Sequence, residues 1–558
     1  METDMKANLY AAVFLLLSGL SLPLSAQELL GDTKVKDFPT EMPWAYPYMP
    51  LDWNEAGWYI AHDPALQVGP GEFIHIYRPE RSNERQRFVR KYNLYAEQVW
   101  EQKVELAFNE EFIHSYLLGD TLVLISSQFA FTEQQHYLRA RKLLTEDGKQ
   151  VEEKLMLFLS GASAHEILFE VSPDGKKMLA WRFSGNKPDS RPRLYYDYVR
   201  RDESPGYKAA RVRKIDYVLF EQNLSRAREG SFTVSESPRT VWIDVRPDNK
   251  GNIFATGHEK HKGLIVLRLP LGASEPEERS WADFPKLSET RELYTLHFPA
   301  MITEQGALCV VRVDRTDPKF IQQTTRAFEI IRFDFDKPEA EVLRMDITST
   351  LLVQMEKQRE AAGFKPTGRF DKYLVHKVVE MPDHSLWFVA QRFEVNAHSE
   401  LAEQGAARSH SEYRAGEVLL MGIDAAGVPI RMITIPTQRN ISTAIESLGL
   451  LADVTADTAQ FRMRILTTEP SEGRLRGPER LFYREADLIT GKVSERVQVY
   501  EGKNRLQYIM PAYYVWLNEG LLAFVSAEGD DDDAHVVTVN LSGQKQEETD
   551  RKKKRVNE

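Results

Sequence analysis

Short runs of hydrophobic, β-favouring residues recur along the chain and are separated by residues that favour tight turns. The stretch HEILFEVSPDGKKMLAWRF (residues 165–183) illustrates the pattern, because two such runs flank the tetrapeptide Ser172-Pro173-Asp174-Gly175. Proline fixes φ, aspartate can bond its own backbone and glycine accepts a positive φ. The stretch therefore predicts a β-hairpin.

Hairpins of this kind recur along the whole chain. Their turns are expected at Gly119-Asp120, Pro173-Asp174, Pro247-Asp248, Gln305-Gly306, Pro382-Asp383, Ala456-Asp457 and Asn518-Glu519, with a longer version over Gly57 to Arg78. After each of them comes a hairpin of a second kind, such as LRARKLLTEDGKQVEEKL or VLLMGIDAAGVPIRMI, in which an apolar strand ends in a polar turn. The two kinds alternate, which is the mark of a repeat with a period of about sixty residues.

The repeat indicates an all-β chain made of four-stranded units. A lone four-stranded sheet cannot cover both of its faces, whereas sheets stacked around an axis bury one another. We therefore predict a β-propeller of seven or eight four-stranded blades over residues 57–544. Eight blades are favoured, and seven would follow if the first unit is only an arm. Two tandem β-sandwiches are the alternative, although they would not require the hairpins to alternate.

One segment departs from the repeat with a helical pattern. Between the fifth and sixth units lies DITSTLLVQMEKQREAAGFKPTGRF, where Ser349 or Thr350 could cap a short inserted helix and Gly363 could end it. Leu351, Leu352 and Met355 form an apolar patch on this helix. The patch favours packing across a blade edge, with partner docking as the alternative. Residues 396–416 are polar and are expected to form a mobile loop.

The N-terminal residues resemble a secretory signal peptide. Lys6 supplies the positive charge, Leu9 to Leu20 the apolar run and Leu24-Ser25-Ala26 a small-residue cleavage site. We expect residues 1–26 to be removed and the protein to be exported to a periplasm or the extracellular space; an uncleaved membrane anchor is the alternative. No transmembrane span is expected after cleavage. Residues 27–56 are expected to form a Pro/aromatic-rich arm, and residues 545–558 a charged disordered tail.

Charge and cysteine content restrict the function classes. The 558-residue chain carries a formal charge of −11, which argues against nucleic acid as a ligand because phosphate contacts need clustered Lys and Arg. Cys309 is the only cysteine, so no intramolecular disulfide can form. It lies in the alternating stretch GALCVVRV, which indicates a small buried hydrophobic residue rather than a catalytic thiol.

Aromatic residues gather in two segments outside the repeat. Rigid aromatic segments can dock a partner or stack on sugar rings, and loops held by a rigid scaffold often carry specificity. An arm that packs across the propeller's own face, or a solvated insertion, are the structural alternatives. The candidate binding residues are Trp44, Tyr46, Tyr48, Trp53, Trp58, Tyr195, Tyr196 and Tyr198.

Catalytic and metal-binding motifs are sparse. Gly161-Ala162-Ser163-Ala164-His165 breaks the nucleophile-elbow pattern at its last residue. His258 and His261 in TGHEKHKG are three residues apart, in an expected turn and without an evident third zinc ligand. Asp531 and Asp533 belong to a row of four aspartates that lacks the alternation of calcium loops. These four residues are weak metal candidates, and we expect no catalytic residue, no metal and no cofactor.

One turn points to a family. The segment Ala486-Asp487-Leu488-Ile489-Thr490-Gly491-Lys492 resembles the outer-strand turn of the PQQ-type propeller repeat, and LLTEDGKQV (residues 143–151) is a looser match. Glu495 stands where that repeat has a tryptophan, and a single cysteine rules out the adjacent cysteines of several quinoprotein alcohol dehydrogenases. The resemblance implies an eight-bladed propeller of the non-catalytic periplasmic scaffold branch, without a bound quinone.

Together these features favour an exported protein-interaction or cell-envelope assembly scaffold, whose partner is a protein or an envelope component. Two alternatives remain open. One is a hydrolase or lyase that acts on polysaccharide or peptide through carboxylates at the channel mouth. The other is a propeller that binds a glycan or small ligand without turnover.

Overall fold

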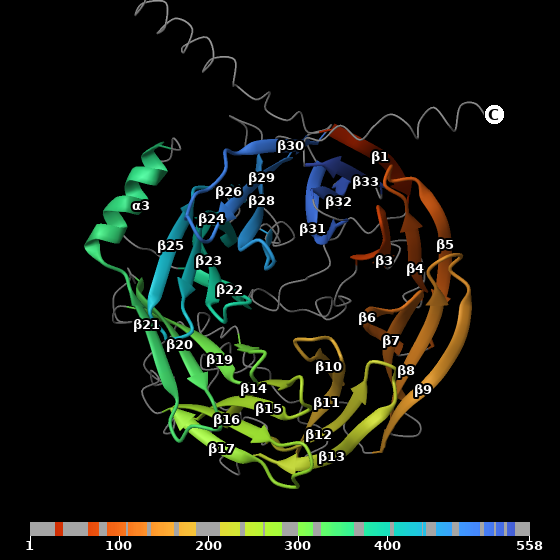
Figure 1. Ribbon diagram of the computed structural model, residues 1–558. Helices are drawn as coiled ribbons and strands as arrows, with labels where there is room; N and C mark the ends of the chain where they lie inside the picture. Colours follow the sequence, from red (N-terminus) through yellow and green to blue (C-terminus); the bar gives the residue numbers. More distant parts are fainter. Residues whose placement is uncertain are drawn as a thin grey trace, which may run out of the picture.

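The computed structural model contains eight antiparallel sheets arranged as blades around a central axis (Figure 1). It describes residues 28–36, 65–77, 86–107, 110–130, 135–160, 167–185, 212–234, 240–259, 263–281, 300–315, 325–361, 373–401, 407–437, 439–441, 453–470, 479–502, 507–517, 520–528 and 533–541. The prediction of an all-β propeller with eight four-stranded blades and one short helix is confirmed.

The first four blades follow the chain, each from its inner to its outer strand. Blade one contains β2 (Ala65–Gly69), β3 (Glu72–Tyr77), β4 (Gln86–Tyr92) and β5 (Gln98–Glu105). Blade two contains β6 (Glu110–Leu118), β7 (Thr121–Ala130), β8 (Gln135–Leu144) and β9 (Gln150–Ser160). Blade three contains β10 (Leu168–Val171), β11 (Lys177–Gly185), β12 (Val212–Glu221) and β13 (Arg226–Thr233). Blade four contains β14 (Thr240–Pro247), β15 (Ile253–Glu259), β16 (Gly263–Leu269) and β17 (Glu277–Trp281).

The remaining blades repeat this order with two additions. Blade five contains β18 (Ala300–Ile302), β19 (Leu308–Arg315), β20 (Thr325–Phe333) and β21 (Glu341–Asp346), and α3 (Ser349–Ala361) follows it. Blade six contains β22 (Tyr373–Glu380), β23 (Leu386–Leu401), β24 (Ala407–Ile423) and β25 (Pro429–Ile435), with β26 (Arg439–Ile441) paired to β24. Blade seven contains β27 (Asp453–Asp457), β28 (Arg462–Pro470), β29 (Glu479–Asp487) and β30 (Val497–Glu501). Blade eight contains β31 (Gln507–Trp516), β32 (Leu521–Glu528), β33 (Asp533–Asn540) and β1 (Glu28–Lys36).

Closure of the ring differs from the expected domain organisation. The sequence pattern assigns residues 27–56 to an arm and ends the eighth unit with residues after Asn540. In the structure, β1 is the outermost strand of blade eight and pairs with β33, from Glu28 opposite Asn540 to Lys36 opposite Asp533. A pairing between the two ends of a chain leaves no local sequence signal, because the period of a repeat identifies neighbours only.

Two smaller expectations also change. Thr348 caps α3 instead of Ser349 or Thr350, because its Oγ1 accepts the hydrogen bond from the amide of Leu351 at 3.2 Å. Residues 396–416, expected to form a loop, largely extend β23 and β24 into a long hairpin in which His398 lies opposite His410. Pairing between the two strands satisfies the backbone of this polar segment without an apolar face.

Apolar side chains fill the spaces between neighbouring blades. Blades five and six enclose a cluster that includes Cys309, Phe328, Phe388 and Met355 of α3. Burial raises the pKa of the Cys309 thiol to about 12, which fits the predicted small buried hydrophobic residue. Leu351 and Leu352 pack against the same cluster, so the apolar patch of α3 covers a blade edge as expected. No helix within the described ranges is long and apolar enough to cross a membrane.

The turns between strands are fixed by side chains of aspartate and asparagine. Asp174 accepts a hydrogen bond from the amide of Lys176 at 3.1 Å, and Asp383 accepts one from the amide of Ser385 at 3.0 Å. Asn93 does the same for the amide of Tyr95 at 2.9 Å. These local bonds explain why turn-forming residues predict the hairpins correctly.

Candidate partner-binding face

The two faces of the ring differ in the connections that they carry. In blades one to seven the first-to-second and third-to-fourth strands are joined at one face, which we call the turn face; examples are the turns at residues 119–120 and 145–149. In blade eight only β31 and β32 are joined there, because the fourth strand, β1, precedes blade one in the chain. The second-to-third connections and the links between blades leave from the other face, which we call the loop face. The long connections, such as residues 186–211 and 282–299, join strand ends at this loop face.

The buried residues of the second strand change from apolar to polar along the strand, from the turn face towards the loop face. It begins with buried apolar residues near the turn face, and its first buried polar residue follows closer to the loop face. This holds in seven blades for the side chains that the structure describes: His75, Ser126, Arg182, Thr256, Gln391, Thr467 and Ser526. In β7, for example, the buried run Leu122, Val123, Leu124, Ile125 precedes Ser126. Buried polar groups are costly unless they are bonded. Three of this set, Ser126, Arg182 and Gln391, donate hydrogen bonds to another strand of their own blade.

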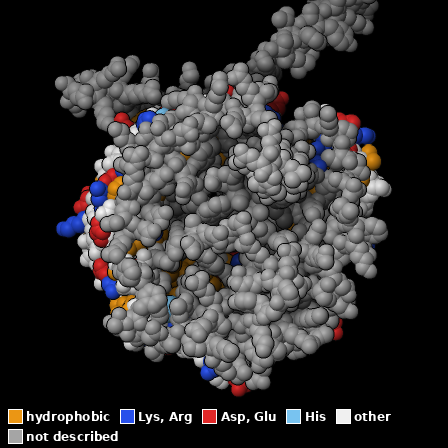
Figure 2. All heavy atoms as spheres, turned by 180° about the vertical axis from the view of Figure 1, so that it is seen from behind, with side chains coloured by type: hydrophobic (Ala, Val, Ile, Leu, Met, Phe, Trp, Pro, Cys, Tyr) orange, Lys and Arg blue, Asp and Glu red, His pale blue; other side chains and the backbone are white. Residues whose placement is uncertain are grey.

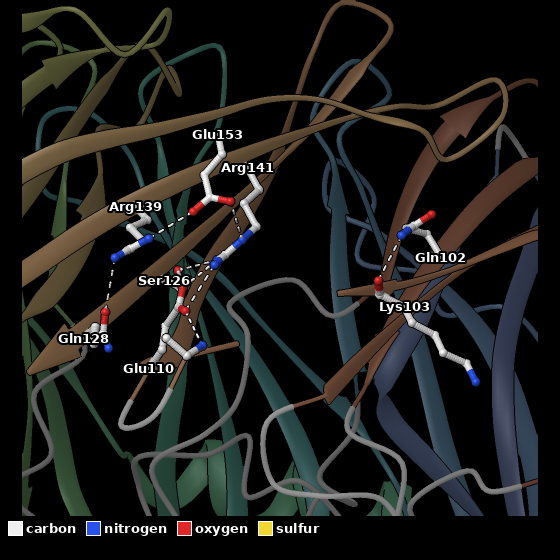
Figure 3. Close-up of polar contacts among 9 residues, drawn as sticks. Gln102, Lys103, Glu110, Ser126, Gln128, Arg139, Arg141 and Glu153 are labelled. Atoms are coloured by element: carbon white, nitrogen blue, oxygen red, sulfur yellow. Dashed lines mark hydrogen bonds and ion pairs between the residues drawn. The ribbon is translucent and has the colours of Figure 1, made fainter. Parts of the chain in front are cut away.

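The most enclosed group of this set lies in blade two (Figure 3). The carboxylate of Glu110, at the loop-face end of β6, accepts hydrogen bonds from Arg141 of β8 at 2.5 and 3.1 Å. Ser126 of β7 donates a further hydrogen bond to it, and so does the amide of Ala107 at 2.6 Å. Arg139, two residues before Arg141 on the same face of β8, bonds Glu153 of β9 at 3.0 Å, and Glu153 also lies 3.6 Å from Arg141. Every strand of the blade therefore contributes to one bonded cluster.

A second buried group connects α3 to blade six. Glu417 of β24, 2% exposed, accepts hydrogen bonds from the Arg359 guanidinium of α3 and from the Tyr373 hydroxyl of β22 at 2.5 Å. Arg392 lies 3.9 Å from the same carboxylate. Arg359 is itself buried. The ion pair therefore fixes the helix beside the loop-face end of blade six.

Two further polar pairs complete what we call the polar layer, defined by the pairs Glu110–Arg141, Arg182–Asp216, Arg359–Glu417 and Asp32–His535. Arg182 Nε donates to Asp216 at 3.1 Å between the central strands of blade three. His535 Nδ1 lies 2.6 Å from Asp32, between β33 and the closing strand β1. Three of the pairs join two different strands, and Arg359–Glu417 joins α3 to β24, so the layer fixes the strand ends from which the loop-face connections leave.

The electrostatics of the polar layer suit a structural role. Burial alone would raise the pKa of Glu110, but the hydrogen bonds from Arg141, Ser126 and the Ala107 amide outweigh burial and hold the pKa below its ordinary value. A carboxylate of this kind is ionised and fully bonded, so it does not supply a proton as a general acid would. Within the described part of the chain, no three His, Cys, Asp or Glu side chains come close enough to hold a metal ion.

The aromatic candidates all belong to loop-face connections. Trp44, Tyr46, Tyr48, Trp53 and Trp58 lie in residues 37–64, which join the end of β1 to the start of β2. Tyr195, Tyr196 and Tyr198 lie in residues 186–211, which join β11 to β12. All eight residues fall outside the described residues, so their role stays a prediction. The strand ends from which their segments leave are described, and both pairs of ends lie at the loop face.

The two weak metal candidates that the structure describes, His258 and Asp533, also lie at this face. His258 is in β15, opposite Val241 and Leu264, rather than in the expected turn, because the strand pairing extends to Glu259. Asp533 is the first residue of β33 and lies opposite Lys36. His261 and Asp531 are outside the described residues, in connections of blades four and eight.

Sequence reasoning missed the residues of the polar layer. Glu110 and Arg141 come from different strands, and no spacing rule connects them. A signal was nevertheless present, since runs such as TLVLISS and LLAFVSA change from apolar to polar at a similar point of each repeat. Figure 2 shows the molecule from the side opposite to Figure 1, with described side chains of both charges and hydrophobic ones around its rim.

Comparison with solved structures gives many propellers. A prolyl endopeptidase matches with 12% identity over 84% of this chain and 55% of its own, with a TM-score of 0.32. A polysaccharide lyase matches with 11% identity over 92% of this chain and 100% of its own, with a TM-score of 0.36. The β-propeller domain of the Trilobed protease from Pyrococcus furiosus matches with 12% identity over 78% of this chain and 93% of its own, with a TM-score of 0.33.

The chain spans about half of the length of the prolyl endopeptidase that it matches. No family model and no curated protein matches the sequence. The resemblance to PQQ-type repeats finds no support among these comparisons, whose matches are propellers of peptidases and of a lyase. At these similarities the neighbours carry no argument about activity. The chain's own eight sheets establish it as an eight-bladed β-propeller.

Proposed function

We propose that the protein is an exported binding scaffold that engages a protein or cell-envelope component through its loop face. One observation carries the proposal: the polar layer fixes the strand ends at this face, and the long connections leave from those ends. Connections on a rigid frame are suited to recognition, because the frame bears the ordering cost in advance. The tight, locally bonded turns of the other face offer little room for variation.

The described carboxylates favour binding over catalysis. Glu110 and Glu417 are each bonded to arginine, and the hydrogen bonds to Glu110 hold its pKa below its ordinary value, whereas a general acid needs a raised pKa. A glycan ligand would bind through the same aromatic segments at the loop face. The crosslinking experiment therefore also distinguishes a glycan from a protein partner.

Site-specific photo-crosslinking in the native host tests the proposal. A photoreactive residue in place of Trp53 or Tyr195 places the probe in loop-face connections, and one in place of exposed Glu146 places it in the 145–149 turn at the turn face. We expect a reproducible partner, identified by mass spectrometry, from the two loop-face positions and none from position 146. Crosslinks from position 146 alone, or only uncrosslinked chain from all three positions, would contradict the proposal. Recovery of a crosslinked glycan without protein would show that the loop face binds a glycan instead of a protein partner.

Fractionation tests export separately. The mature chain should begin near Gln27 and accumulate outside the cytoplasm, whereas an intact N-terminus in the cytoplasmic fraction would contradict export. N-terminal sequencing of the purified native protein distinguishes these results, whatever the crosslinking shows.

A further inference from the structure

We propose that the outer edge of β33 is a strand-acceptor site that can take β1 from a second copy of this chain. In the structure the site holds β1 of the same chain, paired from Glu28–Asn540 to Lys36–Asp533. An extended segment that pairs with a sheet edge gains affinity from main-chain hydrogen bonds and specificity from side-chain contacts. β1 from a second copy has the same sequence, so it can make the same main-chain and side-chain contacts with β33.

The acceptor does not need β1 for its apolar core. The cluster between blades seven and eight includes Leu522, Phe524, Val537 and Val539, and none of its residues comes from β1. Among the β1 side chains that the structure describes, Leu30 and Val35 are the buried apolar ones, while Leu29 is 51% exposed. The strands β31 to β33 are thus packed against blade seven without β1, and the outer edge of β33 is the part of blade eight that β1 covers.

Selectivity for β1 comes first from Gly31. A Cβ at this position would lie 2.1 Å from the carbonyl oxygen of Tyr95, in the 93–97 turn of blade one. Beside this contact, the Thr538 hydroxyl of β33 donates to the carbonyl of Leu94 at 2.7 Å. Backbone of blade one therefore approaches the closing strand so closely that only glycine fits at this point of the register.

A hydrogen-bonded pair adds a second determinant. His535 of β33 lies 2.6 Å from Asp32, and the side chains of both are only 9% exposed. Asp32 comes directly after Gly31. Position 31 of the incoming strand has no room for a Cβ, and position 32 must present a carboxylate to His535. A strand shifted by one register position would place neither residue correctly.

The connection to the rest of the chain allows exchange. Residues 37–64 separate β1 from β2, whereas blades one and two are joined by residues 106–109 alone. Exchange of an identical element between copies keeps every contact of the closed ring, so it needs only a connection long enough to reach the other copy. Pairing within one chain should dominate in dilute solution, and pairing between copies should rise with concentration.

Disulfide trapping between two full-length chains tests the inference, with Cys309→Ala in both. Thr33 and Val536 are partners in the ladder, so Thr33→Cys in one chain and Val536→Cys in the other can bond only across an exchanged strand. The chains are unfolded, mixed, refolded at high concentration and oxidised. We expect at least ten times more disulfide-linked dimer than from Thr33→Cys with Val539→Cys, because Val539 pairs with Leu29 and lies out of reach.

Two matched changes in the Thr33→Cys chain test the determinants. Gly31→Ala should lower the dimer yield at least tenfold, and Leu29→Ala, at an exposed position, should change it less than twofold. A single chain with Thr33→Cys and Val536→Cys checks the register by forming its internal disulfide. If that internal bond forms but the mixed chains give no more dimer than the mismatched pair, exchange does not occur. Equal yields with Gly31→Ala and Leu29→Ala would overturn the selectivity, and failure of the internal bond would overturn the register itself.

Discussion

Arg141 donates hydrogen bonds to both carboxylate oxygens of Glu110, through Nη1 to Oε1 at 2.5 Å and through Nη2 to Oε2 at 3.1 Å. The two residues lie on different strands of blade two, and both are buried. A buried pair of this geometry is costly to break, because removal of one partner leaves an uncompensated charge inside the protein.

Arg141→Met should therefore lower the free energy of unfolding by about 3–5 kcal/mol, as measured by urea denaturation. Glu110→Gln in the same chain should recover much of the loss, because the remaining group is neutral and still accepts hydrogen bonds. Arg139→Met is the matched control, since its partner Glu153 is 39% exposed. That change should cost about 1 kcal/mol or less.

The same pair predicts a dependence on pH. The pKa of Glu110 is lowered in the folded state, so the pair stabilises the fold above the ordinary value of 4.5 and loses that effect as the pH falls through the folded pKa. The difference in the free energy of unfolding between wild type and Arg141→Met should thus become smaller below pH 4.5. A difference in unfolding free energy between the two proteins that stays constant as the pH falls from 4.5 through the folded pKa would contradict the assignment.

Gly148 and Gly175 allow the cost of a positive φ to be measured apart from the cost of a steric clash. Gly148 and Gly175 have φ values of 74° and 71°, but a Cβ at Gly148 would lie 2.7 Å from the ring of Trp100, while Gly175 faces open space. Gly175→Ala should cost about 1–2 kcal/mol from φ alone. Gly148→Ala should cost roughly 1–3 kcal/mol more, because the indole must shift. Equal losses in thermal or urea unfolding would show that the Trp100 contact adjusts freely.

His75 predicts acid sensitivity in blade one. It is fully buried beside Phe73 and Tyr92, and burial lowers its pKa from 6.5 to about 3. The unfolded chain takes up a proton below pH 6.5 and the folded chain does not, so stability should fall as the pH decreases towards 3. Relative to His75→Gln, wild type should lose about 1.4 kcal/mol per pH unit over this window. Parallel stability curves of the two proteins would rule out a buried neutral imidazole.

Arg359 should control the attachment of α3. Arg359→Ala leaves Glu417 buried without its helix partner, and we expect a loss of about 3–5 kcal/mol together with faster proteolysis within residues 349–361. Lys357→Ala, at an exposed position of the same helix, should change stability by less than about 0.5 kcal/mol. Protection of the helix in Arg359→Ala would mean that Met355 and its apolar neighbours hold it alone.

What the sequence predicts well is local. Asp174 and Asp383 bond amides two residues away, so each turn carries its own signal, and the number of blades follows from counting turns. The inserted helix was recognisable for the same reason, although the capping residue is Thr348 rather than its neighbours.

What the sequence does not predict depends on pairing in space. Asp32 and His535 meet only because the ring closes, and Glu110 and Arg141 meet because β6 and β8 flank the same strand. The expected loop at residues 396–416 shows the opposite error: polar composition argued against strands, but pairing between β23 and β24 satisfies the backbone without apolar cover.

The order of the ladder around the ring has a consequence for biosynthesis. β1 is synthesised before the other blade strands, whereas its partner β33 follows about five hundred residues later. Seven blades can form as the chain grows, while the first strand waits with its edge unpaired. A chain that ends before residue 533 lacks β33, so β1 has no partner strand, and exposed strand edges of this kind favour aggregation and recognition by chaperones.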